Sequence, residues 1–191
     1  MKERIKALLT REPSSEIVRA EGWVRTKRDS KNVCFLEIND GSCLKGLQAV
    51  IDKASFNNNN LLDSISTGAA VSVEGTIVES LGGNQKVELA VTSLDLVGPC
   101  PNDYPLQKKR HTVEFLREQA YLRPRTNLFG AVTRVRNTMA FAVHQFFQEN
   151  GFVYAHSPLL TASDCEGAGE MFRVTTLDLE NVPKNEDGTV D

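Results

Sequence analysis

The chain has 191 residues, of which 40% are hydrophobic, and a formal net charge of −3 at pH 7. This length accommodates one large domain, or one domain with part of another. The small net charge excludes general attraction to polyanions, so any contact with nucleic acid must come from a local basic patch. No stretch reaches the roughly 20 apolar residues of a membrane span, and no apolar run near the N-terminus is long enough for a signal peptide.

The cysteines indicate free thiols rather than a metal centre. Cys34, Cys43, Cys100 and Cys165 form no Cys-x-x-Cys pair, and no histidine accompanies them at zinc-ligand spacing. We therefore expect reduced thiols in a soluble cytoplasmic protein, and we assign no metal ligand.

Alternation of apolar and polar residues predicts five strands between residues 16 and 98. The expected strands are 17–28, 33–39, 44–51, 70–79 and 87–97. A short helix is expected between the third and fourth strands, at 61–66. This order is that of an OB-fold, a five-stranded Greek-key barrel whose second and third strands often bind oligonucleotides.

Two side chains on these strands have the chemistry of a nucleic-acid site. Phe35 on the second strand can stack a base, and Gln48 on the third can read a base edge. A basic rim that can hold phosphates flanks the connection between strands one and two, at Arg25, Lys27, Arg28 and Lys31. The alternative is that Phe35 belongs to the core and the basic residues form a solvated loop. The residues alone leave both interpretations open.

Residues 99–127 are predicted to form a linker, because they show little regular pattern, are rich in proline at the start and are basic at 108–111. A helix is then expected from Leu128 to its stop at Asn150-Gly151. Its apolar residues recur every three or four positions, at Leu128, Val132, Val135, Met139, Val143 and Phe146. Further apolar residues widen this stripe, which indicates burial against a subunit partner or deep within one chain.

A strand is expected at 152–157, ending at Pro158, and a polar glycine-bearing loop follows it. Glu166 lies at the centre of that loop, next to Gly167, where a ligand can approach closely. Such a carboxylate can bind the ammonium group of an amino acid, although an ordinary solvated turn is the alternative. One helix and one strand cannot close a core, so the second domain is expected to be incomplete.

Several motifs together resemble the class IIb aminoacyl-tRNA synthetases. The barrel carries Gly22-Trp23-Val24-Arg25, Arg28-Asp29-Ser30 and Asp40-Gly41-Ser42, as their anticodon-binding domain does. The helix and strand from Leu128 to Pro158 are similar to motif 1 of the class II catalytic domain. Within the class, residues 121–127, 161–172 and 173–178 resemble the asparaginyl-tRNA synthetases.

The resemblance implies an OB-fold β barrel followed by the start of an α+β class II synthetase catalytic domain, incomplete in this chain. The expected division is an anticodon-binding domain at 1–98, a linker at 99–127 and the first part of the catalytic domain at 128–191. The implied activity is ATP-dependent activation of asparagine and its transfer to tRNA-Asn. The implied partners are tRNA-Asn, asparagine and a second copy in a homodimer, with no membrane or DNA partner.

The resemblance also implies roles for particular residues. Glu166 matches the glutamate that binds the substrate ammonium in the aspartyl relative, and Ser163 and Gly167 would line the same pocket. Phe35 would stack on the central anticodon uridine, Gln48 would hydrogen-bond it, and Arg28 would hold the nearby backbone. The helix from Leu128, together with Pro158, would form the dimer interface.

Motifs 2 and 3, which carry the ATP-binding arginines of the family, are absent from these residues. ATP and Mg²⁺ are therefore expected for the complete enzyme but have no site in the motifs present, and no catalytic residue is assigned. We expect that this polypeptide alone does not activate asparagine. The alternatives are a freestanding OB-fold tRNA-binding protein and a fragment of an aspartyl-type ligase. The residues Glu166-Gly167-Ala168-Gly169 argue against the aspartyl form, which usually carries arginine where Gly169 stands.

Overall fold

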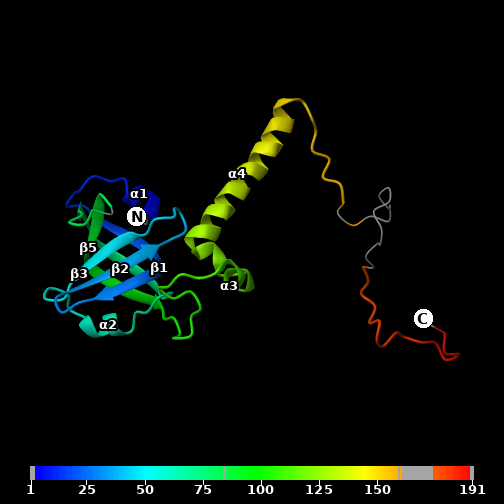
Figure 1. Cartoon of the computed structure of the whole chain (residues 1–191), viewed down its shortest axis with the longest axis horizontal. Coiled ribbons are helices and arrows are strands. Elements are labelled where there is room, and N and C mark those ends of the chain that lie inside the picture. Colours follow the sequence, from blue (N-terminus) through cyan, green and yellow to red (C-terminus); the bar gives the residue numbers. More distant parts are fainter. Residues whose placement is uncertain (1–2, 84, 159, 161–173, 190–191) are drawn as a thin grey trace. The chain divides into compact units, whose positions relative to one another are not determined.

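The computed structural model describes residues 3–83, 85–158, 160 and 174–189 of the chain (Figure 1). The chain divides into two compact units, Met1–His144 and Gln145–Asp191. The first contains the whole barrel and most of the long helix.

Five strands form a closed barrel in the order β1-β2-β3-β5-β4. Their bounds are β1 Ile17–Asp29, β2 Val33–Asn39, β3 Leu47–Asp52, β4 Ala70–Glu79 and β5 Val87–Gly98. Neighbouring strands are antiparallel except β3 and β5, whose parallel pairing closes the barrel. The short helix α2, Asn59–Asp63, lies between β3 and β4. The predicted OB-fold order is therefore confirmed, although the third strand begins three residues later than expected.

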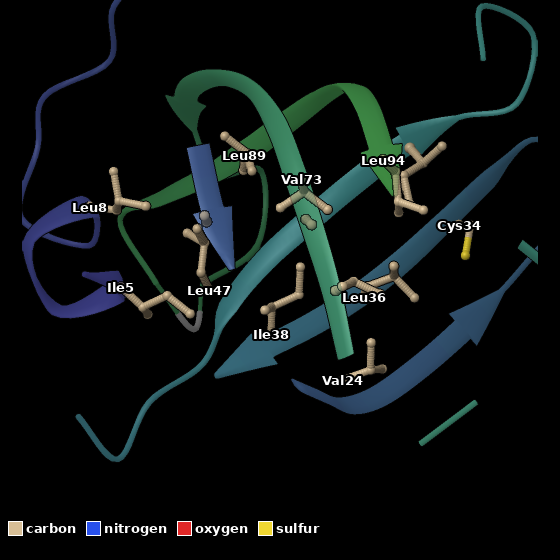
Figure 2. Packing of buried hydrophobic residues seen from close by; sticks show 14 of the residues in the cluster. Ile5, Leu8, Val24, Cys34, Leu36, Ile38, Leu47, Val73, Leu89 and Leu94 are labelled. Atoms are coloured by element: carbon tan, nitrogen blue, oxygen red, sulfur yellow. The ribbon is translucent and has the colours of Figure 1, made fainter. Parts of the chain in front are cut away.

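The core fills the inside of this barrel. Alternate residues of β2, namely Cys34, Leu36 and Ile38, are fully buried, as the period of two along a strand requires. Ile5 and Leu8 come from α1, a four-residue helix at Ile5–Leu8 that was too short to show in the sequence pattern. Figure 2 shows these two side chains in the same cluster as the inward residues of the strands.

Asp40 ties α1 to the end of β2. Its Oδ2 accepts the backbone N–H of Ile5 at 3.1 Å, and its Oδ1 accepts the backbone N–H and the hydroxyl of Ser42 at 2.9 Å and 2.5 Å. Burial acts to raise the pKa of Asp40, but the bonds from Ser42 and Ile5 outweigh it and hold that pKa below its ordinary value.

The segment between the barrel and the long helix is more regular than expected. It contains α3, Val113–Glu118, and a short 3₁₀ helix η1, Arg123–Arg125. Thr112 caps α3, because its hydroxyl accepts the N–H of Phe115 at 3.2 Å. The boundaries proposed at residues 98 and 127 stay predictions.

The expected long helix is present as α4, Asn127–Glu149. It is followed by Gly151 in the left-handed region at φ +81°, as a glycine C-cap requires. The expected strand at 152–157 is wrong for this structure, because these residues are not in a strand. A strand needs a hydrogen-bonded neighbour, and the described residues supply none there. Residues 185–188 form a turn, in which the backbone N–H of Gly188 donates to the carbonyl of Asn185 at 2.9 Å.

Replacing Asp40 by alanine should lower the free energy of unfolding by about 1–3 kcal/mol at neutral pH, because it removes the acceptor of three hydrogen bonds. The folded pKa lies below the unfolded value, so the contribution of the carboxylate is present above about pH 4 and is lost as the pH falls through the folded pKa. Urea titrations between neutral pH and about pH 3 should therefore show the difference from the wild type shrinking.

Asp95→Ala is the matched control, since Asp95 is an exposed carboxylate on β5. It should change stability little at any pH. A deficit of Asp40→Ala that persists undiminished in acid would contradict the assigned role of the ionised carboxylate.

Candidate nucleic-acid interface

Three of the predicted site residues lie on one outer face of the barrel. Arg28 on β1 pairs with Phe35 on β2. Phe35 in turn pairs with Val50 on β3, and Glu37 pairs with Gln48. Because the intervening residues of β2 point into the core, Phe35 and Glu37 point outward. We call the outward side chains of Arg28, Phe35, Glu37 and Gln48 the β1–β3 face.

Phe35 is not a core residue. It is half-buried, and it belongs neither to the buried cluster nor to the partly buried residues that pack against it. The structure thus favours the interpretation of Phe35 as a surface aromatic over its interpretation as core. A half-buried ring on a barrel surface can offer a face to a nucleic-acid base.

The guanidinium of Arg28 lies over the ring of Phe35, with its central carbon 4.5 Å from the ring centroid. Both a guanidinium plane and an aromatic ring can stack on a base. Arg28 is exposed, and within the described residues its side chain makes no other contact, so it can move off the ring towards a phosphate. The pair therefore combines a stacking surface with a positive charge.

Gln48 is held by a residue that the sequence analysis missed. Its Nε2 donates to Oε2 of Glu88 on β5 at 3.0 Å, and the hydroxyl of Ser80 donates to the same oxygen at 3.2 Å. Glu88 is only 7% exposed. The sequence contains an indication of this contact. Glu88 is a charged residue between the apolar residues Val87 and Leu89 in a correctly predicted strand, and a carboxylate in such a position needs hydrogen-bond donors.

The predicted basic rim is divided in the structure. Arg25 donates to the carbonyl of Leu44 at 2.9 Å and to Oδ1 of Asn127 at 2.8 Å. Lys27 donates to the carbonyl of Leu62 at 2.5 Å. These two cations therefore stabilise loops and the start of α4, whereas Arg28 and Lys31 are exposed.

A second ion pair lies beside the same connection. Lys53 bonds to Oδ1 of Asp29 at 2.6 Å. The hydrogen bond from Lys53 is the largest cause of a pKa of Asp29 below its ordinary value. Lys53 is thereby neutralised locally, which reduces the positive charge available to an RNA backbone.

Helix α4 begins against the barrel through contacts within the first unit. Arg134 donates to the carbonyl of Gly41 at 2.6 Å. A Cβ on Gly130 would lie 3.1 Å from both Leu44 Cδ2 and the carbonyl oxygen of Pro124, so a glycine permits this close approach. Together with Arg25, these residues connect the β2–β3 loop to the first turns of α4.

Of the remaining predicted site residues, the structure describes Leu128 and Pro158. Glu166, Ser163 and Gly167 lie outside the described residues. Leu128 is 50% exposed near the start of α4, and Pro158 is exposed beyond its end. The apolar side chains of α4 are exposed or half-exposed in this single chain: Leu128, Val132, Val135, Met139, Phe141, Val143, Phe146 and Phe147.

Cys34, Cys43 and Cys100 are free thiols in the part of the chain that the structure describes. Burial raises the pKa of Cys34 and of Cys100, which disfavours their reactive thiolate forms. Within the described residues, the helices are too short or too polar to cross a membrane.

The barrel matches a family model, and the barrel with the helix that follows it resembles solved structures. A family model described as an OB-fold nucleic acid binding domain, tRNA_anti-codon, matches residues 18–97. An asparaginyl-tRNA synthetase of Pyrococcus horikoshii, complexed with asparaginyl-adenylate, superimposes with a TM-score of 0.75 at 22% identity, over 84% of this chain and 37% of that one. A putative aspartyl-tRNA synthetase from Leishmania major superimposes with a TM-score of 0.71 at 20% identity, over 83% and 34%. The fold is a closed five-stranded OB-fold barrel followed by a long helix, and it resembles the corresponding part of these synthetase structures.

The sequence relatives are more specific. An asparagine–tRNA ligase of Syntrophobacter fumaroxidans is 61% identical over 168 residues, which are 87% of this chain and 36% of the relative. One from Bacteroides fragilis is 51% identical over 187 residues, 98% of this chain and 40% of the relative. The chain thus spans about 40% of the length of these curated relatives. Over nearly all its residues it is similar to the N-terminal portion of the asparagine–tRNA ligases, as its motifs predicted.

Arg25 and Arg28, three positions apart on β1, should differ in their effect on stability when each is replaced by alanine. Arg25→Ala should lower the free energy of unfolding by about 1–2 kcal/mol, since it leaves the carbonyl of Leu44 and the amide of Asn127 without their donor. Arg28→Ala should leave stability within about 0.5 kcal/mol, because the side chain is exposed. Chemical denaturation of both variants measures the difference.

The affinity for RNA and its dependence on salt should be affected by the exposed arginine, Arg28. Arg28→Ala should weaken binding of an RNA hairpin and reduce the slope of log affinity against log salt by about one, the value for one lost phosphate contact. Equal stability losses for both variants, or an unchanged salt slope for Arg28→Ala, would contradict the assignment of Arg25 to a structural role and of Arg28 to phosphate binding.

Proposed function

We propose that the chain is the N-terminal part of an asparagine–tRNA ligase, and that its barrel binds the anticodon of tRNA-Asn. The observation that carries this proposal is identity of 51–61% with asparagine–tRNA ligases across 87–98% of the chain. The β1–β3 face supports it, because an aromatic ring, an amide and an exposed cation lie there together. These are the groups that read an unpaired, splayed base.

Each residue of this face has a proposed task. Phe35 stacks on the central anticodon uridine, and Gln48 hydrogen-bonds its edge. Arg28, which lies over the ring in the free chain, moves to the neighbouring phosphate when the base takes its place. The exposed position of Arg28 on β1, opposite Phe35, supports this exchange.

The proposed reaction belongs to the complete enzyme. Asparagine attacks the α-phosphate of ATP, with Mg²⁺, to give asparaginyl-adenylate and pyrophosphate, and the asparaginyl group then passes to the terminal ribose of tRNA-Asn. A solved relative contains asparaginyl-adenylate. We propose that Glu166 binds the ammonium group of asparagine, and that Ser163 and Gly167 line the same pocket. Such chemistry depends on positioning and on stabilising phosphate charge.

A homodimer in the cytoplasm is part of the same proposal. The apolar side chains of α4, Leu128 among them, are exposed in the single chain and need a surface to cover them. A second copy of the chain, contacting Leu128 and Pro158, would supply it.

Phe35→Ala should weaken binding of the tRNA-Asn anticodon hairpin by about 1–3 kcal/mol, because it removes one stacked base. Fluorescence anisotropy with a labelled hairpin measures this loss. Phe141→Ala is the matched control, since Phe141 is an exposed phenylalanine on α4, and it should leave the affinity unchanged. Unchanged affinity for a folded Phe35→Ala variant would refute anticodon binding at this face.

Asparagine-dependent ATP–pyrophosphate exchange tests the catalytic part of the proposal. The 191-residue polypeptide alone should show no exchange, because the family's arginines for ATP lie in motifs that it lacks. The same chain joined to the remaining length of an asparagine–tRNA ligase should exchange, and Glu166→Gln should then raise the KM for asparagine. Robust exchange by the 191 residues alone would overturn this expectation. No exchange by the joined protein would favour the alternative, a freestanding tRNA-binding protein.

A further inference from the structure

We propose that Glu88 is a positioning residue that gives the anticodon site its preference for uridine. It fixes the side-chain amide of Gln48 so that the carbonyl oxygen, and not the nitrogen, is presented to the base. The inference rests on the proposed function, because it assumes that Gln48 contacts an RNA base.

The orientation of the Gln48 amide follows from the chemistry of its partner. Oε2 of Glu88 lies 3.0 Å from Nε2 of Gln48. An ionised carboxylate only accepts hydrogen bonds, so the group that faces it must be the amide nitrogen. A flipped amide would bring two acceptor oxygens to hydrogen-bonding distance with no proton between them. The carbonyl oxygen of Gln48 therefore points away from Glu88.

Burial makes this preference strong. Glu88 is 7% exposed, and within the described residues it forms no ion pair with lysine or arginine. Its donors there are the amide of Gln48 and the hydroxyl of Ser80. Removing a hydrogen-bond donor from a buried carboxylate costs free energy. Charge-assisted hydrogen bonds are also about twice as strong as neutral ones. Gln48 is therefore held in one orientation before any RNA arrives.

The backbone pairing holds the two residues at this distance. Glu88 lies on β5, which runs parallel to β3 through the pairs Ala49–Leu89 and Val50–Ala90. Gln48 precedes Ala49 on β3, just as Glu88 precedes Leu89 on β5. The barrel closure thus places the carboxylate beside the amide.

The carbonyl oxygen of Gln48 can distinguish bases by whether they present a hydrogen-bond donor to it. Within the described residues no hydrogen bond reaches Oε1 of Gln48, so this acceptor is available. Phe35 pairs with Val50, two residues from Gln48 on the same side of β3, so a base stacked on Phe35 lies within reach of the amide. Uracil presents an N3–H donor on its Watson–Crick edge, whereas cytosine presents a lone pair at N3 and has its donor at the 4-amino group. An acceptor that faces N3 therefore favours uridine over cytidine.

The test compares two hairpins that differ in one base. The 191-residue chain is titrated with the tRNA-Asn anticodon hairpin and with the same hairpin carrying cytidine at the central anticodon position. The wild type should prefer uridine by about tenfold or more, the discrimination of one good base contact. Glu88→Gln keeps the shape but offers both a donor and an acceptor, so either orientation of Gln48 is then satisfied. Its preference should fall to about threefold or less.

Two controls keep the result interpretable. Glu79→Gln, an exposed carboxylate on β4, should keep the full preference. If Glu88→Gln does not fold, NMR of the unmutated chain replaces it, and the side-chain amide protons of Gln48 should exchange with solvent more slowly than those of Gln148, an exposed glutamine on α4. Amide protons of Gln48 that exchange as fast as those of Gln148 would overturn the inference.

The outcomes distinguish this inference from the proposed function. If Glu88→Gln binds RNA with the full preference for uridine, or the wild type prefers cytidine, the role of Glu88 is wrong and anticodon binding stands. If the wild type binds neither hairpin, the proposed function itself fails and the inference fails with it.

Discussion

The parallel pairing of β3 with β5 is the constraint on which the rest of the barrel depends. It joins strands that are distant in sequence, through Ala49–Leu89 and Val50–Ala90, and so closes the sheet. In a closed barrel every strand has one side facing the core and one facing outward. The core takes Cys34, Leu36 and Ile38, and the neighbouring outward positions carry polar or aromatic groups. The site is thus the outer side of the same strands that supply the core.

The charges on the β1–β3 face limit how it can bind RNA. Arg25 and Lys27 are engaged within the protein, and Lys53 is paired with Asp29. Glu37 and Glu88 add negative charge beside Phe35 and Gln48. Electrostatic attraction to phosphates is therefore modest, and stacking and directed hydrogen bonds must carry more of the affinity. This balance suits a domain that reads a few unpaired bases.

The sequence predicted the elements whose pattern is local. Alternation along the strands predicted the barrel, and the apolar period of α4 predicted the helix. Phe35 and Gln48 were assigned to the second and third strands and Arg28 to the basic rim, and the strand pairing in the structure brings the three onto one face. Contacts between distant strands were out of reach, so Glu88 beside Gln48 was missed, as were the ties of Arg25 to Leu44 and Asn127. The strand expected at 152–157 failed because alternation alone does not supply a pairing partner.

The central claim is that the outer side of β1, β2 and β3 binds the anticodon loop. Amide chemical shifts of the isotope-labelled chain, followed while the tRNA-Asn anticodon hairpin is added, test it most directly. The account predicts that the largest shifts cluster at Arg28, Phe35 and Gln48, and that Glu74 on β4 changes little. Shifts concentrated on β4 with none at Phe35 would contradict it.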